Sequence, residues 1–185
     1  MNYQEILNKG NKVLKGNNIK SSNIDCELIL SKILNKTREE ILTNLNNKID
    51  KNERDKFNFY VNIRKRKKPM SYILGFKYFW KHKFYIDKSV LIPRPESEQL
   101  IEQALKYIPV EKKLSILDIG TGSGCLIVSL LKERPKCHAT AIDLSKEALK
   151  VAKINANMHH LENKIKFLNI DIDKFNSNKY DLIIS

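Results

Sequence analysis

Three glycines at alternate positions, Gly120, Gly122 and Gly124, lie between two apolar segments of different periodicity. The first segment, 114–119, has the pattern of a strand that is buried on both faces. The second, 125–131, is apolar at helical spacing. Glycine allows positive φ and close approach of a ligand, and a helix N-terminus offers unpaired N–H groups. The sequence therefore predicts a nucleotide site at this strand-to-helix turn.

The spacing of the glycines distinguishes between kinds of nucleotide. A dinucleotide fingerprint needs G-x-G-x-x-G, but the third residue after Gly122 is Cys125. The phosphate-binding pattern G-x-x-x-x-G-K-[ST] also fails, because no Lys-Ser or Lys-Thr follows Gly124. The pattern that is present, D-x-G-x-G-x-G over 118–124, resembles the first motif of class I S-adenosylmethionine (SAM) methyltransferases. The alternative is a glycine-rich turn without a ligand.

Two acidic residues follow later apolar runs. Asp143 lies in the run 138–144, nineteen positions after the last glycine of the loop. A carboxylate about 20 residues after a glycine loop accepts hydrogen bonds from ribose hydroxyls; the alternative is that Asp143 caps the helix beginning near Ser145. Asp171 follows a strand predicted over 165–170, where it would either face an adenine amino group or serve as a turn residue.

Composition limits the classes of protein to consider. The 185 residues are 42% hydrophobic and 30% charged, no apolar run reaches the roughly 18 residues of a spanning helix, and no signal pattern opens the chain. The cysteines Cys26, Cys125 and Cys137 match neither a disulfide framework nor a metal site, and the four histidines lack partners at ligand spacing. We therefore expect a cytoplasmic protein without a metal.

The net charge of +13 raises the question of a nucleic-acid partner. The charge is spread along the chain, and its one dense run, 64–68, suits a helix C-terminus, where cations are favoured. Direct nucleic-acid binding is therefore not favoured, although an acidic or RNA-associated partner stays open.

The chain before the glycine loop separates into a helical part and a hairpin. Four amphipathic segments predict a small helical bundle over 1–74. The second is expected to be capped by Ser22 or Asn23, the third begins with a capping box at Thr37, and the fourth begins with a helix start signal at Asp50. Aromatic residues then alternate loosely, which predicts a β-hairpin, and a proline-rich turn leads into a helix; the two together form the linker 75–95.

Strand and helix patterns alternate over 96–185. This order predicts an α/β fold with a doubly wound parallel sheet and ligands at the carboxyl ends of its strands. The last expected strand, 180–184, stands at the end of the chain. Since a parallel sheet needs both faces covered, we expect the chain to be part of a longer protein.

Taken together, these segments resemble the release factor glutamine methyltransferase family (PrmC/HemK). The matching motifs are Pro-Met-Ser-Tyr-Ile-Leu-Gly at 69–75, Ile-Pro-Arg-Pro-Glu-Ser-Glu at 92–98, the glycine motif at 117–125, Ala-Ile-Asp-Leu-Ser at 141–145 and Asp-Leu-Ile-Ile-Ser at 181–185. The glycine motif is generic to SAM enzymes, and 92–98 is far more specific. The resemblance implies that 1–74 is a substrate-recognition domain and that 96–185 is a Rossmann-like methyltransferase domain, truncated at its C-terminus.

The resemblance also implies an activity: transfer of a methyl group from SAM to the glutamine amide nitrogen in the Gly-Gly-Gln loop of peptide chain release factors. The family's catalytic Asn-Pro-Pro-Tyr would begin directly after Ser185, so we expect this chain to hold the cofactor half of the site and to be inactive alone. The implied cofactor contacts are Gly120, Thr121, Gly122, Ser123, Gly124, Asp143, Asp171 and Ile172. Arg94 and Glu98 are expected near the cofactor or substrate cleft, or in a salt-bridged hinge. We expect a monomer.

Two other functions are open. A DNA or RNA amino-methyltransferase would use a related motif and suits a basic chain, but the element 92–98 and the small helical domain argue against it. The second open function is that of a non-catalytic fragment that binds SAM.

Overall fold

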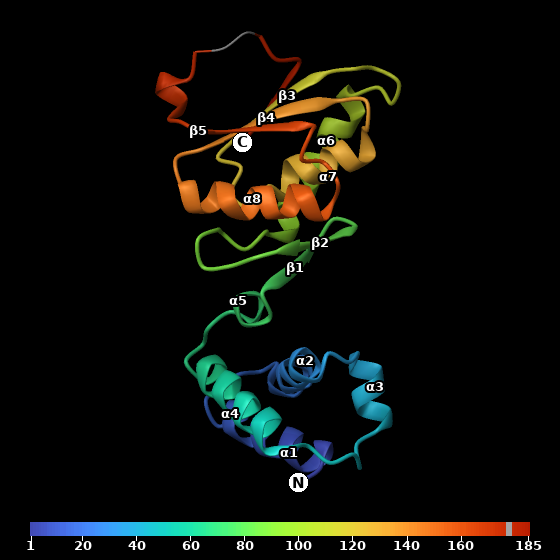
Figure 1. Ribbon diagram of the computed structural model, residues 1–185, viewed down its shortest axis with the longest axis vertical. Helices are drawn as coiled ribbons and strands as arrows, with labels where there is room; N and C mark the ends of the chain where they lie inside the picture. The colour runs from blue at the N-terminus through green and yellow to red at the C-terminus, as the bar shows by residue number, and fades with distance from the viewer. Residues whose placement is uncertain (177–178) are drawn as a thin grey trace. The chain divides into compact units, whose positions relative to one another are not determined.

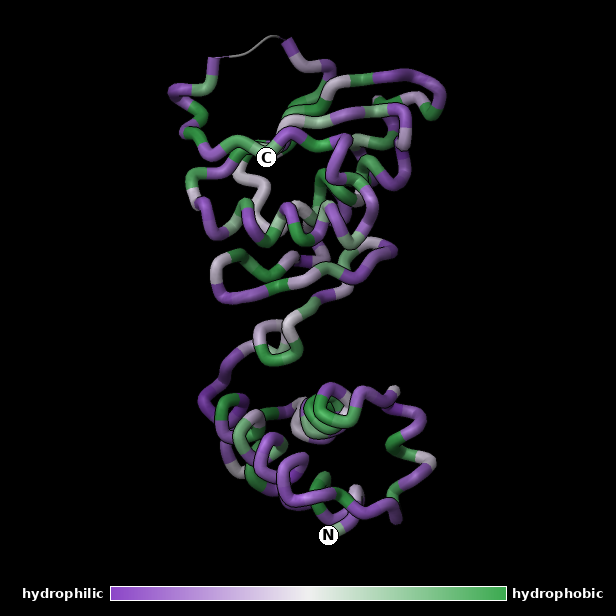
Figure 2. The backbone as a smooth tube through the Cα atoms, in the orientation of Figure 1, coloured by the Kyte–Doolittle hydropathy of each residue, from purple (hydrophilic) through white to green (hydrophobic). Residues whose placement is uncertain are grey.

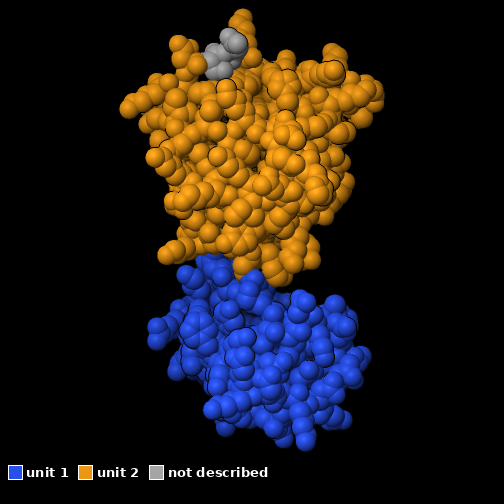
Figure 3. Space-filling view, viewed as in Figure 1, with its two compact units in different colours: residues 1–74 blue, residues 75–185 orange. Residues whose placement is uncertain are grey.

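The computed structural model describes residues 1–176 and 179–185. The chain divides into two compact units, Met1–Leu74 and Gly75–Ser185 (Figure 3). Within the described residues, no helix is long and apolar enough to cross a membrane.

The first unit is helical, as the sequence predicts. Its helices are α1 (Tyr3–Lys15), α2 (Ser22–Leu34), α3 (Arg38–Thr43), α4 (Lys51–Lys65) and α5 (Met70–Leu74) (Figure 1). The capping box predicted at Thr37 and the helix start predicted at Asp50 are confirmed, because each side chain accepts the N–H of the glutamate three residues later. The predicted cap of α2 is wrong: the N-cap is Ser21, whose hydroxyl donates to Asp25 and does not bind the backbone of α2.

The core of the first unit is apolar with one buried ion pair. Leucine, isoleucine and phenylalanine side chains from α1, α2, α3 and α4 are fully buried: Ile6, Leu14, Ile29, Leu30, Ile41 and Phe57. Asp25 is 3% exposed, and its Oδ2 lies 2.7 Å from the Nε of Arg64 on α4. The ion pair therefore joins α2 to α4 in a region with little access to water.

The second unit begins with a hairpin and continues as alternating strands and helices. Its elements are β1 (Phe76–Phe79), β2 (His82–Tyr85), η1 (Pro95–Ser97), α6 (Glu98–Tyr107), β3 (Ser115–Ile119), α7 (Cys125–Glu133), β4 (His138–Asp143), α8 (Lys146–Met158), β5 (Ile165–Asn169), η2 (Ile172–Lys174) and β6 (Leu182–Ile184). The hairpin is antiparallel, with Phe76 opposite Tyr85. Pro95 opens η1, which confirms the predicted helix start.

The four strands that follow the hairpin form one parallel sheet in the order β5-β4-β3-β6. Helices α6, α7 and α8 lie together on one side of this sheet (Figure 1). Apolar stretches run along the strands, whereas apolar and polar residues alternate along the helices (Figure 2). The predicted α/β fold with a helical N-terminal bundle is confirmed. Because the chain passes to opposite sides of β3 for β4 and β6, ligands are expected at the carboxyl end of β3.

Candidate functional site

The loop between β3 and α7 is built on left-handed backbone. Gly120, Gly122 and Gly124 have φ of +70°, +55° and +77°. Two backbone N–H groups, those of Gly120 and Thr121, donate to the carbonyl of Ile142 on β4 at 2.9 and 3.0 Å. Residues with a Cβ rarely adopt this φ, so the glycines are what allow the chain to turn this sharply into the helix.

Two of these glycines have different surroundings. A Cβ added to Gly120 would meet nothing within 4 Å, so the backbone there faces open space. A Cβ added to Gly124 would lie 3.2 Å from the Cβ of Ala152 on α8. Gly124 therefore lets α8 approach the loop, whereas Gly120 leaves room on the side where a ligand can approach the backbone.

Asp118, near the end of β3, is a buried residue that binds the side chain of Thr121 in the glycine loop. It is 1% exposed, and its Oδ2 accepts the hydroxyl of Thr121 at 2.6 Å. Burial raises the pKa of its carboxyl to about 6. Asp118 is part of the glycine motif, but no role is predicted for it from the sequence. Its contact with Thr121 is local, so the three-residue spacing is the signal that could have found it.

Asp143, at the end of β4, contacts the glycine loop directly. Its Oδ2 accepts the N–H of Gly122 at 2.9 Å, and its Oδ1 accepts the N–H of Ser145 at 2.8 Å. The N-cap of α8 is Ser145 itself, whose hydroxyl oxygen accepts the N–H of Ala148. Each carboxylate oxygen has a second lone pair, so Asp143 can accept further hydrogen bonds from a ligand's hydroxyl groups.

A pocket of about 150 Å³ lies where the carboxyl ends of β3, β4 and β5 meet. It is lined by Ile119, Gly120, Ile142, Asp143, Leu144, Ile170, Asp171 and Ile172. Leu144 and Ile172 are 72% and 44% exposed apolar residues of this lining. Apolar walls with carboxylates suit a flat ring joined to a group that carries hydroxyls. The pocket is about half the lower end of the usual range for small-molecule sites, so it accommodates part of a ligand.

The structure thus brings four of the predicted site residues to one pocket, namely Gly120, Asp143, Asp171 and Ile172. Asp171 also accepts the N–H of Asp173 at 3.1 Å, so it serves the turn as well as the pocket. Thr121 and Ser123 are 7% and 3% exposed and support the loop from within.

Arg94 and Glu98 do not form the ion pair of the predicted hinge in the part of the chain that is described. Glu98 accepts the backbone N–H of Trp80 at 2.7 Å, at the turn of the hairpin. Arg94 is exposed and is the N-cap residue of η1. Glu98 therefore fixes the hairpin turn to the start of α6, a contact between residues that are eighteen positions apart.

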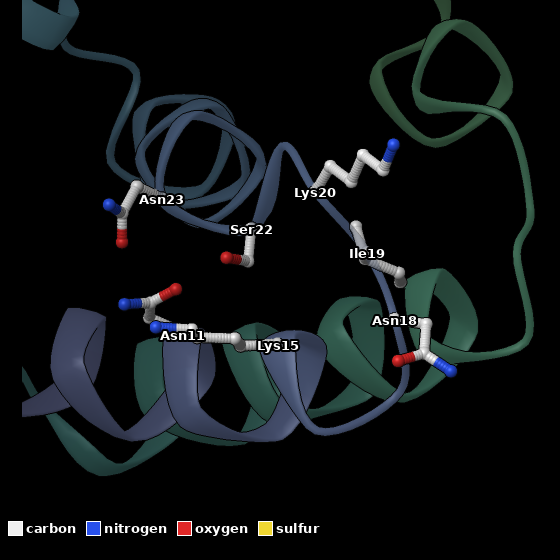
Figure 4. A pocket seen from close by; sticks show the side chains of 7 residues that line it. All are labelled: Asn11, Lys15, Asn18, Ile19, Lys20, Ser22 and Asn23. Atoms are coloured by element: carbon white, nitrogen blue, oxygen red, sulfur yellow. The ribbon is translucent and has the colours of Figure 1, made fainter.

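A larger pocket, of about 640 Å³, lies in the first unit and contains none of the predicted site residues. It is lined by Asn11, Lys15, Asn18, Ile19, Lys20, Ser22 and Asn23 (Figure 4). The lining has no carboxylate, cysteine or histidine side chain. Across residues 1–176 and 179–185, no group of three or more His, Cys, Asp or Glu side chains is placed to hold a metal ion. The glycine loop and its pocket are therefore the candidate site.

Two family models match the chain. The model described as "PrmC N-terminal domain" matches residues 5–75, and the model described as "Methyltransferase domain" matches residues 110–185. The first coincides closely with the helical unit, and the second includes β3, the glycine loop and the rest of the sheet.

Curated relatives match both units. The chain is 39% identical to "Release factor glutamine methyltransferase" of Coxiella burnetii over 78% of this chain and 52% of that protein. It is 33% identical to the protein of the same name from Clostridium acetobutylicum, over 100% of this chain and 66% of that protein. It is 32% identical to "Bifunctional methyltransferase" of Rickettsia typhi, over 98% of this chain and 39% of that protein. The chain thus spans 39 to 66% of the length of these relatives.

Proposed function

Because the chain belongs to the release factor glutamine methyltransferase family, we propose that its glycine loop binds SAM and that it takes part in methylating release factors. The acceptor is the amide nitrogen of glutamine in the Gly-Gly-Gln loop of a peptide chain release factor. The observation that supports the cofactor assignment is the convergence of the open backbone at Gly120 with the carboxylate of Asp143 at one pocket.

The residues of the site fit the parts of SAM. Asp143 has free lone pairs for ribose hydroxyls, the apolar pocket beside Leu144 and Ile172 suits the adenine ring, and Asp171 is an acceptor for its amino group. The open space at Gly120 leaves room for the rest of the molecule along the loop. When bound, SAM supplies an electrophilic methyl group on a sulfonium.

The amide nitrogen of glutamine is a weak nucleophile, so the enzyme must position it closely and polarise it. The residues of this chain hold the methyl donor. We assign the contacts to the acceptor amide to the family's Asn-Pro-Pro-Tyr element, which does not occur in residues 1–185. The helical unit Met1–Leu74 is the proposed recognition domain for the release factor.

Binding of SAM to this chain tests the cofactor assignment. Titration calorimetry is expected to give saturable binding that Asp143→Ala weakens about tenfold to a hundredfold, because a charge-assisted hydrogen bond is worth roughly 1.5–3 kcal/mol. Asp173→Ala is the control, since that exposed side chain lies outside the pocket lining. Equal affinities for the two variants would contradict the assignment of Asp143.

Transfer of labelled methyl groups tests the activity. A protein that carries this chain together with the family's Asn-Pro-Pro-Tyr element is expected to label a release factor and to leave a Gly-Gly-Ala variant of that factor unlabelled. Labelling of nucleic acid alone would overturn the proposal.

A further inference from the structure

Asn155, on α8, is a fully buried side chain outside the lining of the cofactor pocket, with 0% of its surface exposed. Its carboxamide makes three hydrogen bonds to two distant segments. Oδ1 accepts the N–H of Tyr85 at 2.7 Å, and Nδ2 donates to the carbonyls of Tyr85 at 3.0 Å and of Ser123 at 2.8 Å. Since Tyr85 ends the hairpin and Ser123 lies in the glycine loop, one amide joins the two.

The outer edge of the hairpin has backbone groups that need a hydrogen-bond partner, and Asn155 provides it. Ile86 donates its N–H to the carbonyl of Gly75, so these two residues face each other across the ladder. The next residue of an antiparallel strand turns its N–H and C=O away from the partner strand. Tyr85 is that residue, and Asn155 pairs with both groups as the peptide of a neighbouring strand would.

The glycine loop is held by α8 through the same face of the helix. Ala152 and Asn155 are three positions apart, so they lie on one side of α8. The Cβ of Ala152 lies 3.2 Å from the position that a Cβ on Gly124 would take, and Asn155 donates to the carbonyl of Ser123. The first half of the loop is instead held by the end of β4. Loss of Asn155 would therefore leave a buried carbonyl unpaired in the second half of the loop.

We propose that Asn155 is a positioning residue that couples the docking of the hairpin to the shape of the cofactor loop. A displacement of the hairpin then changes the affinity of the loop for SAM, although the hairpin lines no part of the cofactor pocket. This inference rests on the proposed function, because it concerns the loop assigned to SAM. The family motif at 92–98 follows the hairpin after residues 86–91, and Glu98 of that motif binds the hairpin turn, so the hairpin is fixed at both ends.

The first test compares Asn155 with a matched residue on the same helix. Asn155→Ala and Asn155→Asp are expected to weaken SAM binding about tenfold or more, because each leaves buried backbone groups unpaired. Asn157→Ala and Asn157→Asp are the controls, since Asn157 is exposed, and they are expected to stay within about twofold of the wild type. Circular dichroism checks that every variant is folded. Equal affinities at the two positions would overturn the inference.

The second test uses no cofactor. Hydrogen exchange of the SAM-free chain is expected to speed up at both 120–125 and 82–86 in Asn155→Ala. His159→Ala loosens the hairpin elsewhere, because His159 Nε2 lies 3.0 Å from the carbonyl oxygen of Lys83. When Asn155 is present, His159→Ala is expected to speed hydrogen exchange in the glycine loop, 120–125. When Asn155 is already replaced by alanine, adding His159→Ala is expected to cause no further change in that loop. Loop exchange that is unaffected by His159→Ala would overturn the coupling.

The two tests separate the inference from the proposed function. Failure of the wild-type chain to bind SAM would refute the cofactor assignment, whereas the exchange experiment would still decide whether Asn155 couples hairpin and loop. When SAM binding is measured instead of exchange, His159→Ala is expected to lower the affinity for SAM only when Asn155 is present. Additive effects of the two variants would show that the two sites act independently.

Discussion

Alanine at two glycines of the cofactor loop separates backbone strain from steric contact. Gly120 and Gly124 have nearly equal φ, +70° and +77°, so alanine is strained to a similar degree at both. Their surroundings differ: a Cβ at Gly120 meets nothing within 4 Å, whereas one at Gly124 lies 3.2 and 3.3 Å from the Cβ and Cα of Ala152. The two variants are therefore matched in φ and differ in this contact and in the space for a ligand.

The expected losses in the free energy of unfolding follow from the backbone angles and from these contact distances. Left-handed backbone costs an L-residue about 1–2 kcal/mol, and the lower freedom of the unfolded alanine chain offsets about 0.4–1 kcal/mol of it. Gly120→Ala is therefore expected to lower the free energy of unfolding by about 1 kcal/mol. At Gly124 the contacts include the backbone of α8, which cannot rotate away, so overpacking adds roughly 1–3 kcal/mol.

Urea unfolding measures the two losses, with an unchanged m-value as the check that the unfolding reaction is the same. Calorimetric titration with SAM then measures the affinity of each variant for the cofactor. Gly120→Ala, the more stable variant, is expected to lose SAM affinity because its methyl group occupies the open space of the loop. The double variant Gly124→Ala with Ala152→Gly is expected to recover only the part of the steric loss that comes from the Cβ of Ala152, because the contact with the Cα remains. If Gly124→Ala unfolds no more easily than Gly120→Ala, or if Gly120→Ala binds SAM like the wild type, the reasoning is refuted.

Two further predictions concern buried charges. Burial raises the pKa of Asp118 to about 6, so the folded chain holds a proton that the unfolded chain releases between about pH 4 and 6. Stability is expected to fall by roughly 3 kcal/mol as pH rises through that window and to lose this dependence in Asp118→Asn, measured by urea unfolding at several pH values; an unchanged slope would contradict it. Arg64→Ala is expected to destabilise the chain by about 3 kcal/mol, because it leaves Asp25 buried without its cation. Arg54→Ala, at an exposed ion pair, is expected to change thermal unfolding little, and equal losses would refute the distinction.

Much of the fold could be predicted because its signals are local. The capping boxes at Thr37 and Asp50 depend on residues three positions apart, and such contacts form within one helical turn. The cap of α2 was wrongly placed because adjacent serines are equivalent in sequence. The structure distinguishes them: Ser21 is the N-cap, its hydroxyl donates to Asp25, and its side chain makes no bond to the backbone of α2.

The sequence by itself determined the order of strands and helices, the left-handed turns at the glycines and the family, because these depend on local sterics and on motif spacing. Only the tertiary structure decided what Asn155 and Glu98 do. Asn155 bonds Tyr85 across seventy positions, and Glu98 bonds Trp80 across eighteen. An asparagine on a helix and a glutamate at a helix start are ordinary in sequence. Their partners are backbone groups, which every residue carries, so only the folded arrangement specifies which ones they bind.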